Sequence, residues 1–304
     1  MQIQLGDITI DIISVGGHYT SIQLPNQKIA IDMGICTPVG LRCNHVFFTH
    51  AHTDHIAGVI RHCSTREMMN MPTPTYVIGE EHRAAFDDVF RAWRKLNRSF
   101  MKCNVKTMRP KETMKISQKW GIEAFRSMHR MPCQGYLLYE ERKKLLPKYH
   151  GLPQKEIAEL AKQKVQIIER KKIPLLAYTG DTTIDVLYRE SWLRQVKILL
   201  LEVTFFDEKV SPEMSKKHGH IHIDDIPQQP DFFQNEHVVI LHLSSRYSTE
   251  QVEDIIQEKL PQYLQDKITL IPNHFDSSSD TRGSRNLSLT QGSSAYFRNE
   301  KRKK

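Results

Sequence analysis

The sequence predicts a mixed α/β domain whose functional side chains lie at the ends of strands. Short apolar segments with strand character recur along the chain, at residues 45–49, 121–125, 135–140, 174–180, 196–205, 237–245 and 267–272. Segments with helical spacing of apolar residues lie between them, and polar residues cluster where the strands end. Helices packed on sheets suit a ligand site at one edge of the sheets.

The first 35 residues are expected to form strands. Residues 1–13 alternate polar and apolar side chains, which is typical of a strand. They lack the basic start and the small-residue cleavage site of a signal peptide. Gly16 and Gly17 mark a turn, and the next strand, IAIDMG, ends at Asp32. After a loop, HVFFT at 45–49 forms a short buried strand.

Two helices are predicted. The first covers 80–97, directly after the strand TYVIG. Its apolar residues have helical spacing and are Ala84, Phe86, Val89, Phe90 and Trp93. The second helix follows Ser248, with Gln251 three residues later as a capping-box partner.

The composition is that of an ordinary soluble protein with a sizeable core. The chain has 304 residues, of which 39% are hydrophobic and 26% charged. No apolar stretch approaches the roughly 20 residues needed to cross a bilayer, so no membrane partner is expected. Five cysteines, an odd number with no CxxC pair, indicate reduced thiols and a cytoplasmic protein. The net charge of +8 favours a polyanionic partner, although a basic surface can also serve solubility alone.

Two regions are expected along the chain. Residues 1–272 form one domain, and residues 273–304 form a disordered basic tail that is rich in Ser, Asn and Gly and poor in apolar side chains.

Four potential metal ligands stand within six residues at the end of the strand 45–49. They are His50, His52, Asp54 and His55. Without a ligand, this cluster would place several polar groups at the edge of a core without partners. Imidazoles and a carboxylate suit zinc, with manganese or iron as alternatives. The first two histidines can reach one metal, while the adjacent aspartate and histidine turn toward a second.

The pattern HxHxDH after an apolar strand resembles the signature of the metallo-β-lactamase fold. This resemblance implies an αββα sandwich with two mixed sheets and outer helices. It also implies three further ligands at strand ends: His129, the bridging carboxylate Asp181, and His242. Asp32 resembles the carboxylate that supports the metal loop, and a plain turn aspartate is the alternative. The seven implied ligands of two Zn²⁺ ions (Mn²⁺ or Fe possible) are His50, His52, Asp54, His55, His129, Asp181 and His242.

Later motifs resemble those of the tRNase Z (ribonuclease Z) family. They are Glu202-Val-Thr204, Gly219-His220-Ile-His222 and the stretch from His242 to Arg246-Tyr247. The segment GYLLYEERKKLLPKYHGLP with LAYTGDTT is most similar to the short plant-type enzymes. The resemblance covers residues 5–272.

Two features depart from the family pattern. Residues 141–173 are rich in Lys and Arg and are expected to be helical in PQKEIAELAKQKV, where bacterial members carry a Gly/Pro-rich flexible arm. Ile221-His222 stands where Ser-Thr is frequent, although His220 keeps the family's histidine position.

The resemblance implies an endoribonuclease that removes the 3′ trailer of precursor tRNA. Two metal ions suit phosphodiester hydrolysis because they activate water and stabilise charge on the phosphate. Asp54 would accept a proton, and the pair His220 and Glu202 would orient or protonate the leaving 3′ oxygen. The products are a tRNA 3′-hydroxyl and a trailer with a 5′-phosphate.

Substrate contacts and assembly follow from the same resemblance. Residues that would hold the substrate phosphate are Ser244, Ser245 and Arg246. Residues that would grip the tRNA backbone are Arg142, Lys143, Lys144 and Lys148, for which a solvated helix face is the alternative. Family members are commonly homodimers in which one subunit grips the tRNA that the other cuts.

Two other functions remain open at this point. A hydrolase of the same fold that cleaves a small phosphodiester, a sulfate ester or a lactone would keep the ligands but would need neither the pair Glu202 and His220 nor a basic arm. A non-enzymatic RNA-binding module is disfavoured because all seven ligands are present. β-CASP-type nucleases are disfavoured because the chain has no room for their inserted domain.

Overall fold

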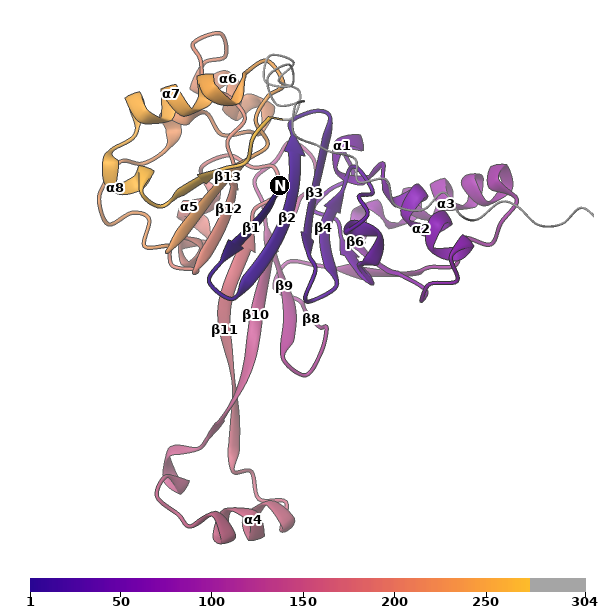
Figure 1. Ribbon diagram of the computed structural model, residues 1–304, viewed down its shortest axis with the longest axis vertical. Coiled ribbons are helices and arrows are strands. Elements are labelled where there is room, and N and C mark those ends of the chain that lie inside the picture. The colour runs from indigo at the N-terminus through magenta and orange to yellow at the C-terminus, as the bar shows by residue number, and fades with distance from the viewer. Residues whose placement is uncertain (274–304) are drawn as a thin grey trace, which may run out of the picture.

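The computed structural model describes residues 1–273, and the tail predicted at 273–304 therefore lies, from residue 274 on, outside the described residues. Two sheets of seven strands pack face to face, and helices cover their outer faces (Figure 1). The first sheet contains β1 (Gln2–Leu5), β2 (Ile8–Val15), β3 (Tyr19–Leu24), β4 (Ile29–Met33), β5 (His45–Phe47), β6 (Thr75–Gly79) and β7 (Asn104–Met108).

The second sheet runs in the order β14-β13-β12-β11-β10-β9-β8. Its strands are β8 (Thr113–Lys115), β9 (Trp120–Arg126), β10 (Gln134–Leu145), β11 (Ile168–Tyr178), β12 (Ile198–Glu202), β13 (His237–Leu241) and β14 (Ile268–Leu270). The helices are α1 (Thr53–Ile56), α2 (Val59–Met68), α3 (Arg83–Asn97), α4 (Gln154–Lys162), α5 (Val186–Arg189), α6 (Pro212–His218), α7 (Thr249–Lys259) and α8 (Gln262–Gln265). The predicted αββα sandwich is confirmed.

Parallel pairing brings several strand ends to one edge of the sandwich. In the first sheet β4, β5, β6 and β7 are parallel neighbours. In the second sheet β11, β12, β13 and β14 are parallel neighbours. Because parallel strands end on the same side, the polar residues that follow them are collected at that edge.

The N-terminal prediction needs one correction. Residues 1–13 form two antiparallel strands, β1 and β2, instead of one. The chain reverses at Gly6, whose φ of +57° is favourable for glycine. The alternation of polar and apolar side chains continues on both sides of the turn, and Ile3, Leu5 and Ile8 all point into the core.

The helix predicted at 80–97 is present as α3, but only some of its apolar side chains are buried. Phe86 and Phe90 are buried, but Val89 and Trp93 are 52% and 42% exposed, and Ala84 is exposed too. The helix packs on the sheet through a narrow stripe at i and i+4, so the rest of its apolar arc faces outward. The exposed apolar side chains of this region, here called the α2–α3 surface, are Met68, Met69, Val89, Trp93, Leu96 and Phe100.

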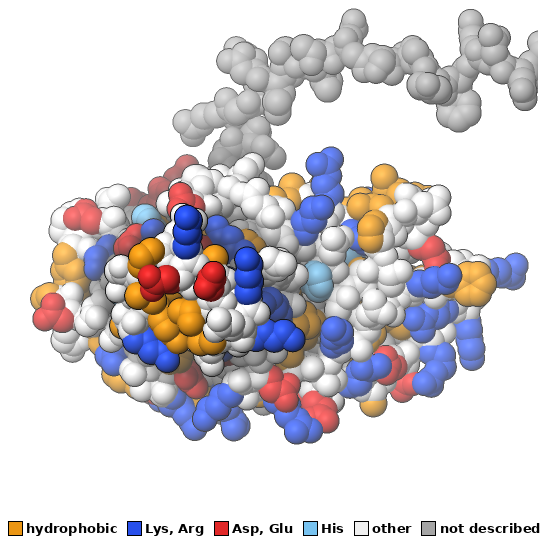
Figure 2. Space-filling view, turned by 90° about the horizontal axis from the view of Figure 1, so that it is seen from below, with side chains coloured by type: hydrophobic (Ala, Val, Ile, Leu, Met, Phe, Trp, Pro, Cys, Tyr) orange, Lys and Arg blue, Asp and Glu red, His pale blue; other side chains and the backbone are white. Residues whose placement is uncertain are grey.

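The basic segment 141–173 forms an arm. Strands β10 and β11 continue beyond the sheet as a two-stranded ribbon with α4 at its tip (Figure 1). The helix expected in this segment is present as α4. The flanking basic residues are in strands because they pair with each other from Glu141 with Lys172 to Leu145 with Ile168. Seen from the tip of the arm, Lys and Arg side chains are spread over this face of the molecule (Figure 2).

The second predicted helix is α7, with Ser248 and Gln251 in the expected capping box. Within residues 1–273, none of the helices combines the length and apolar character required to traverse a bilayer.

Candidate metal centre

The predicted ligands of the first sheet lie just beyond its strand ends. His50 and His52 follow β5, and Asp54 and His55 lie on the short helix α1. His50 and His55 are fully buried, while the other two side chains are partly exposed. These four residues therefore form one wall of a site that opens to solvent.

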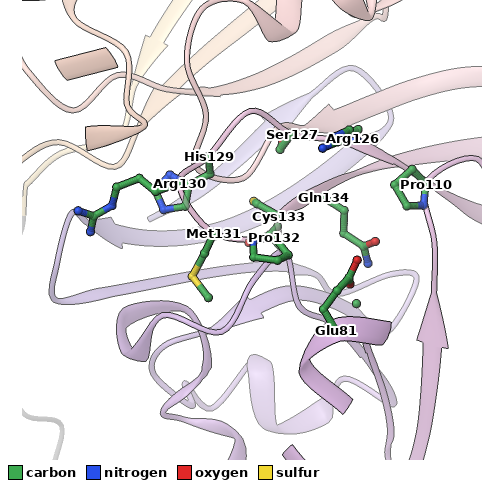
Figure 3. Close-up of a pocket in the computed structure, with 12 residues that line it drawn as sticks. Glu81, Pro110, Arg126, Ser127, His129, Arg130, Met131, Pro132, Cys133 and Gln134 are labelled. Atoms are coloured by element: carbon green, nitrogen blue, oxygen red, sulfur yellow. The ribbon is translucent and has the colours of Figure 1, made fainter. Parts of the chain in front are cut away.

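The second sheet supplies the opposite wall. His129 follows β9, Asp181 follows β11 and His242 follows β13. His129 also lines a cavity of about 390 Å³ that opens beside the cluster (Figure 3). Its loop packs against Gly219, where a Cβ atom would lie 2.6 Å from His129 Nδ1, so glycine permits this close approach.

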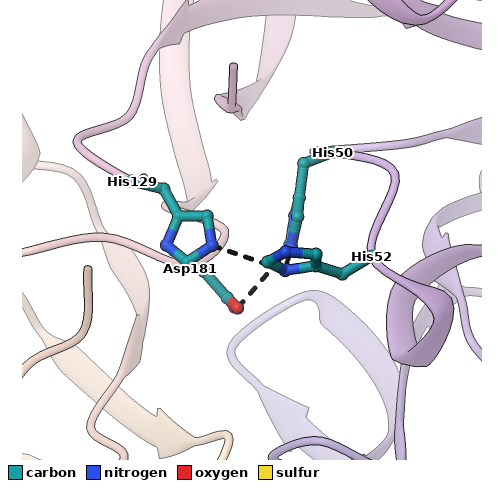
Figure 4. A group of neighbouring side chains, drawn as sticks. All are labelled: His50, His52, His129 and Asp181. Carbon is teal, nitrogen blue, oxygen red and sulfur yellow. Dashed lines mark hydrogen bonds and ion pairs between the residues drawn. The ribbon is translucent and has the colours of Figure 1, made fainter. Parts of the chain in front are cut away.

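The seven predicted ligands come together in two groups, each with geometry that can hold a metal ion. In each group, one ligand atom per residue lies within 4.8 Å of the others. The first group, drawn in Figure 4, consists of His50, His52, His129 and Asp181. The second group consists of Asp54, His55 and His242. Asp181 also groups with His220 and His242, so its carboxylate lies between the two sets.

Four histidines are oriented through Nδ1. His129 Nδ1 donates to the carbonyl of Gly219 at 2.8 Å, and His55 Nδ1 donates to Asp32 Oδ2 at 2.7 Å. His50 Nδ1 lies 2.9 Å from the hydroxyl of Thr49, which donates to Asp32. His242 Nδ1 lies 3.0 Å from the hydroxyl of Thr204, which donates to Glu202. These bonds leave Nε2 of each ring as the available metal-binding atom.

The first group has the protonation state that metal binding requires. Burial lowers the pKa of His50 well below its usual value, and the neighbouring His55 lowers it further. Burial likewise lowers the pKa values of His52 and His129. Nε2 of His50 faces Nδ1 of His52 at 2.9 Å, so these neutral rings present lone pairs to a common point.

Asp181 has a buried oxygen that fits a metal ion. Its carboxylate is 1% exposed, and Oδ1 accepts no hydrogen bond from any described residue. His55 Nε2 and His242 Nε2 lie 3.3 and 3.5 Å from that oxygen. A buried carboxylate oxygen that accepts no hydrogen bond is costly, and a divalent cation bound among these atoms would satisfy it. The donor set of imidazoles and carboxylates therefore fits the metal ions that the fold implies.

Asp32 supports the histidine-rich loop. It is fully buried with φ of +57°, and its carboxylate accepts hydrogen bonds from the backbone N–H of Thr49 at 2.7 Å and from its hydroxyl at 2.8 Å. Burial works to lower the pKa of His55, but Asp181 and Asp32 raise it well above the usual value. Asp32 is thus a supporting carboxylate and not a plain turn residue.

His220 and Glu202 form a buried ion pair next to the ligands. His220 Nδ1 lies 3.0 Å from Glu202 Oε1, and the histidine is 4.0 Å from Asp181 Oδ2. Burial acts to lower the pKa of His220, yet the charge of Glu202 and its hydrogen bond raise that pKa to about 9. His220 is therefore protonated at neutral pH in this geometry.

Three residues of the site were not assigned a role from the sequence. Thr49 joins Asp32 to His50, and Thr204 joins Glu202 to His242. The backbone N–H of Gly17 donates to Asp54 Oδ2 at 2.9 Å. Thr49 and Thr204 adjoin predicted site residues along the chain, which was a usable signal. The glycine contact bridges 37 positions, so only the tertiary structure reveals it.

The predicted phosphate contacts lie directly after His242. The backbone N–H of Ser244 donates to Thr204, and Ser245 and Arg246 are exposed. The guanidinium of Arg246 lies over the rings of Phe205 and Tyr247 at 5.3 and 5.8 Å. These residues border the site.

The predicted tRNA-backbone contacts are not brought to the metal centre. Arg142, Lys143 and Lys144 lie on the arm ribbon, and Lys148 lies near its tip; all four are exposed. Arg142 is paired with Glu140 at 2.8 Å. These side chains face solvent away from the ligands.

Solved structures share the fold. The metallo-β-lactamase fold protein YhfI from Bacillus subtilis is 11% identical and has a TM-score of 0.57 over 88% of this chain and 97% of its own. The short form of human tRNase Z (ELAC1) is 16% identical, with a TM-score of 0.56 over 87% of this chain and 96% of its own. At these identities the likeness establishes the metallo-β-lactamase fold.

Sequence comparison establishes the family. No protein-family model matches the chain. The curated protein tRNase Z TRZ1 of Arabidopsis thaliana is 32% identical over 274 residues, which are 90% of this chain and 98% of the plant protein. This level of identity over nearly the whole of both proteins, together with the predicted motifs, shows that the chain belongs to the tRNase Z (ribonuclease Z) family of endoribonucleases.

Proposed function

We propose that this protein is a zinc-dependent endoribonuclease that removes the 3′ trailer of precursor tRNA. The observation that carries the proposal is the convergence of the seven predicted ligands with the pair Glu202 and His220 at one sheet edge. A hydrolase of small esters needs the ligands alone. The pair is part of the family pattern and lies in contact with the carboxylate of Asp181.

Two Zn²⁺ ions are proposed: each ligand group would hold one, and Asp181, whose carboxylate lies between the groups, would serve both. Nitrogen and oxygen donors favour zinc over magnesium or calcium. When bound, the ions bring the pKa of water to about 7 and stabilise charge on the phosphate.

Two side chains are proposed to transfer protons during cleavage, Asp54 as acceptor and His220 as donor. Asp54 has a carboxylate oxygen that accepts from Gly17 N–H and lies 3.5 Å from His242, which holds it in place as proton acceptor. Burial acts to raise its pKa, but His242 and His55 lower it below the usual value, so the carboxylate of Asp54 is ionised. His220 is protonated and donates its proton to the leaving 3′ oxygen of the tRNA.

Substrate phosphate is held by the segment after His242. Ser244 and Ser245 offer hydroxyl donors, and Arg246 offers a guanidinium suited to bidentate phosphate contact. Cleavage leaves a 3′-hydroxyl on the tRNA and a 5′-phosphate on the trailer.

The arm is proposed to grip the tRNA backbone. Residues 1–272 act as one catalytic domain, and 141–173 are its inserted arm. Lys143 and Lys144 are exposed on the ribbon, where a phosphate backbone can reach them. Arg142 and Lys148 complete the proposed contacts. Arg142 would leave its ion pair with Glu140 to bind a phosphate of the tRNA.

The enzyme is proposed to be a cytoplasmic homodimer. The five cysteines are free thiols, which suits a reducing compartment. The α2–α3 surface supports self-association, because Met68, Leu96 and Phe100 are 76%, 72% and 78% exposed, and monomers rarely leave such a group of large apolar side chains uncovered. A second copy packed there would bury it.

Incubation with a 3′-extended precursor tRNA tests the proposal. We expect a single cut beside the discriminator base, with a 3′-hydroxyl on the tRNA, which a chelator abolishes and zinc restores. Turnover of a small phosphodiester, sulfate ester or lactone without any cut in the tRNA would favour the alternative hydrolase.

A further inference from the structure

The cavity beside His129 has no part in the chemistry described above. We infer that it binds one unpaired nucleotide of the RNA, next to the scissile phosphate. This inference rests on the proposed function and adds a specificity pocket to it. The residues that decide it are Glu81, Arg126, Arg130 and Gln134, all of which line the cavity (Figure 3).

The cavity shares walls with the metal centre. His129 lines it and also presents Nε2 to His52 at 3.4 Å. Thr49 lines it and immediately precedes His50. Cys133 lines it as well, with Sγ 3.5 Å from the carbonyl oxygen of Asp181. An RNA strand with its phosphate at the metals therefore has a flanking nucleotide at the mouth of this cavity.

Two arginines make the cavity suited to an anion. Arg126 and Arg130 are exposed, and across residues 1–273 no carboxylate lies within the 4.0 Å of an ion pair with either of them. In Figure 3 Arg130 extends from the same loop as His129. Free guanidinium groups bind phosphate through two parallel hydrogen bonds and also stack on exposed bases.

The other lining groups suit a base better than a bare phosphate. The carboxylate of Glu81 repels an inorganic anion but accepts hydrogen bonds from base amino and imino groups. The side chain of Gln134 lies above Glu81 in Figure 3, and its amide adds a second polar group. Met131 and Pro132 provide apolar contact for the faces of a base. The combination matches a nucleotide.

The cavity is held in shape by hydrogen bonds around its loop. Ser127 N–H donates to the carbonyl of Cys133 at 3.2 Å, and His82 Nε2 donates to the carbonyl of Pro132 at 2.9 Å. Gln134 Nε2 donates to the hydroxyl of Tyr136 at 2.6 Å, which fixes its amide. A preformed pocket loses less entropy when it orders a flexible RNA end.

Precursor tRNAs that lack one base test the inference. The substrates are intact, abasic at the discriminator position, or abasic at the first trailer nucleotide. The metal-loaded proteins are wild type, Arg126→Ala, Arg130→Ala and Glu81→Gln, with Arg42→Ala as control because it is an exposed arginine outside the cavity. The measurement is kcat/KM for each pair of protein and substrate.

We expect wild type and Arg42→Ala to lose about tenfold in kcat/KM on one of the two abasic substrates, and that substrate identifies which nucleotide enters the cavity. On the intact substrate, kcat/KM of Glu81→Gln and of the two arginine variants is about tenfold below wild type. On that same abasic substrate, kcat/KM of these variants falls no further. The inference is overturned, and the proposed function is not, if the abasic substrates lower kcat/KM equally in wild type and all variants, or do not lower it at all. A wild-type protein that cuts no precursor tRNA overturns the proposed function and the inference together.

Discussion

At the scale of single residues, the site depends on which ring nitrogen each histidine exposes. Nδ1 of His55 is held by Asp32, and Nδ1 of His129 is held by the backbone at Gly219. Each bond fixes a tautomer and turns Nε2 toward the centre. Asp181 completes the arrangement with an oxygen that no described residue satisfies.

Replacing the bridging carboxylate is expected to remove both metal and activity. Asp181→Ala takes away the carboxylate that lies between the two ligand sets, so cleavage is expected to be abolished and bound zinc to fall. Metal content by elemental analysis and trailer release from precursor tRNA measure the two effects. Asp88→Ala is the control, since Asp88 is 64% exposed on α3. Full cleavage by the Asp181 variant contradicts the bridging role.

His220 is expected to titrate well above an ordinary histidine in the metal-free protein. Burial opposes its charge, but Glu202 raises its pKa from 6.5 to about 9. Because the folded-state pKa is raised, the ion pair stabilises the protein fully below about pH 6.5, and this stabilisation is lost as pH rises through about 9.

Glu202→Gln removes the carboxylate charge, so the pKa of His220 should fall, and the loss of stability should begin at lower pH. Histidine NMR titration and thermal unfolding against pH measure these changes, with the exposed Glu236→Gln as control. An unchanged His220 titration in Glu202→Gln shows that another group sets its pKa.

At the scale of elements, the arm separates substrate binding from chemistry. β10 begins beside the His129 loop and runs away from it, so one strand links the metal centre to the basic ribbon. Ion pairs of the ribbon with its neighbours, such as Lys172 with Glu123 and Lys115 with Glu141, tie its base to the sheet. Exposed lysines beyond this base remain available for a polyanion.

Lys143→Ala/Lys144→Ala should raise KM for precursor tRNA with little change in kcat. The slope of log affinity against log salt should drop by about 2, because two phosphate contacts are lost. Steady-state kinetics at several salt concentrations measure both. The control is Lys102→Ala/Lys106→Ala, two exposed lysines outside the arm. If the kinetics are identical to wild type, the two lysines belong to an ordinary solvated face and do not contact tRNA.

At the scale of the whole molecule, the two sheets enclose a shared core, and α2 and α3 expose apolar side chains on their outer side. Residues from both sheets meet in a shared core that includes Ile22, Phe47, Tyr136 and Leu200. Helices α2 and α3 cover the first sheet through Cys63 and Phe90, among others, but carry the α2–α3 surface on their outer side. That surface is where a second copy is proposed to pack.

A charge placed on this surface should dissociate the proposed dimer. Leu96→Glu puts a carboxylate where apolar contact is expected, so the protein should change from dimer to monomer in analytical ultracentrifugation. Ile168→Glu on the arm, 41% exposed, is the control and should leave the dimer intact. A wild-type protein that sediments as a monomer at micromolar concentration removes the basis for the dimer.

Sequence patterns predicted most of the elements and the composition of the site. Strand alternation, the capping box at Ser248 and the motif around His50 are local signals, because each depends on residues close together in the chain. The extension of β10 and β11 into a ribbon was not predicted. Its basic residues resemble a helix or loop until one strand pairs with the other, with partners 23 to 31 positions apart, from Leu145 with Ile168 to Glu141 with Lys172.

The sequence by itself determined which residue types are available for metal and acid–base chemistry and that they follow strands. Only the tertiary structure decided that Gly17 bonds Asp54, that Thr204 contacts His242, and that a cavity opens beside His129 with two arginines that no carboxylate of residues 1–273 pairs. The physical reason is that these contacts join residues far apart in the chain, and only the pairing of strands within two stacked sheets sets their distances.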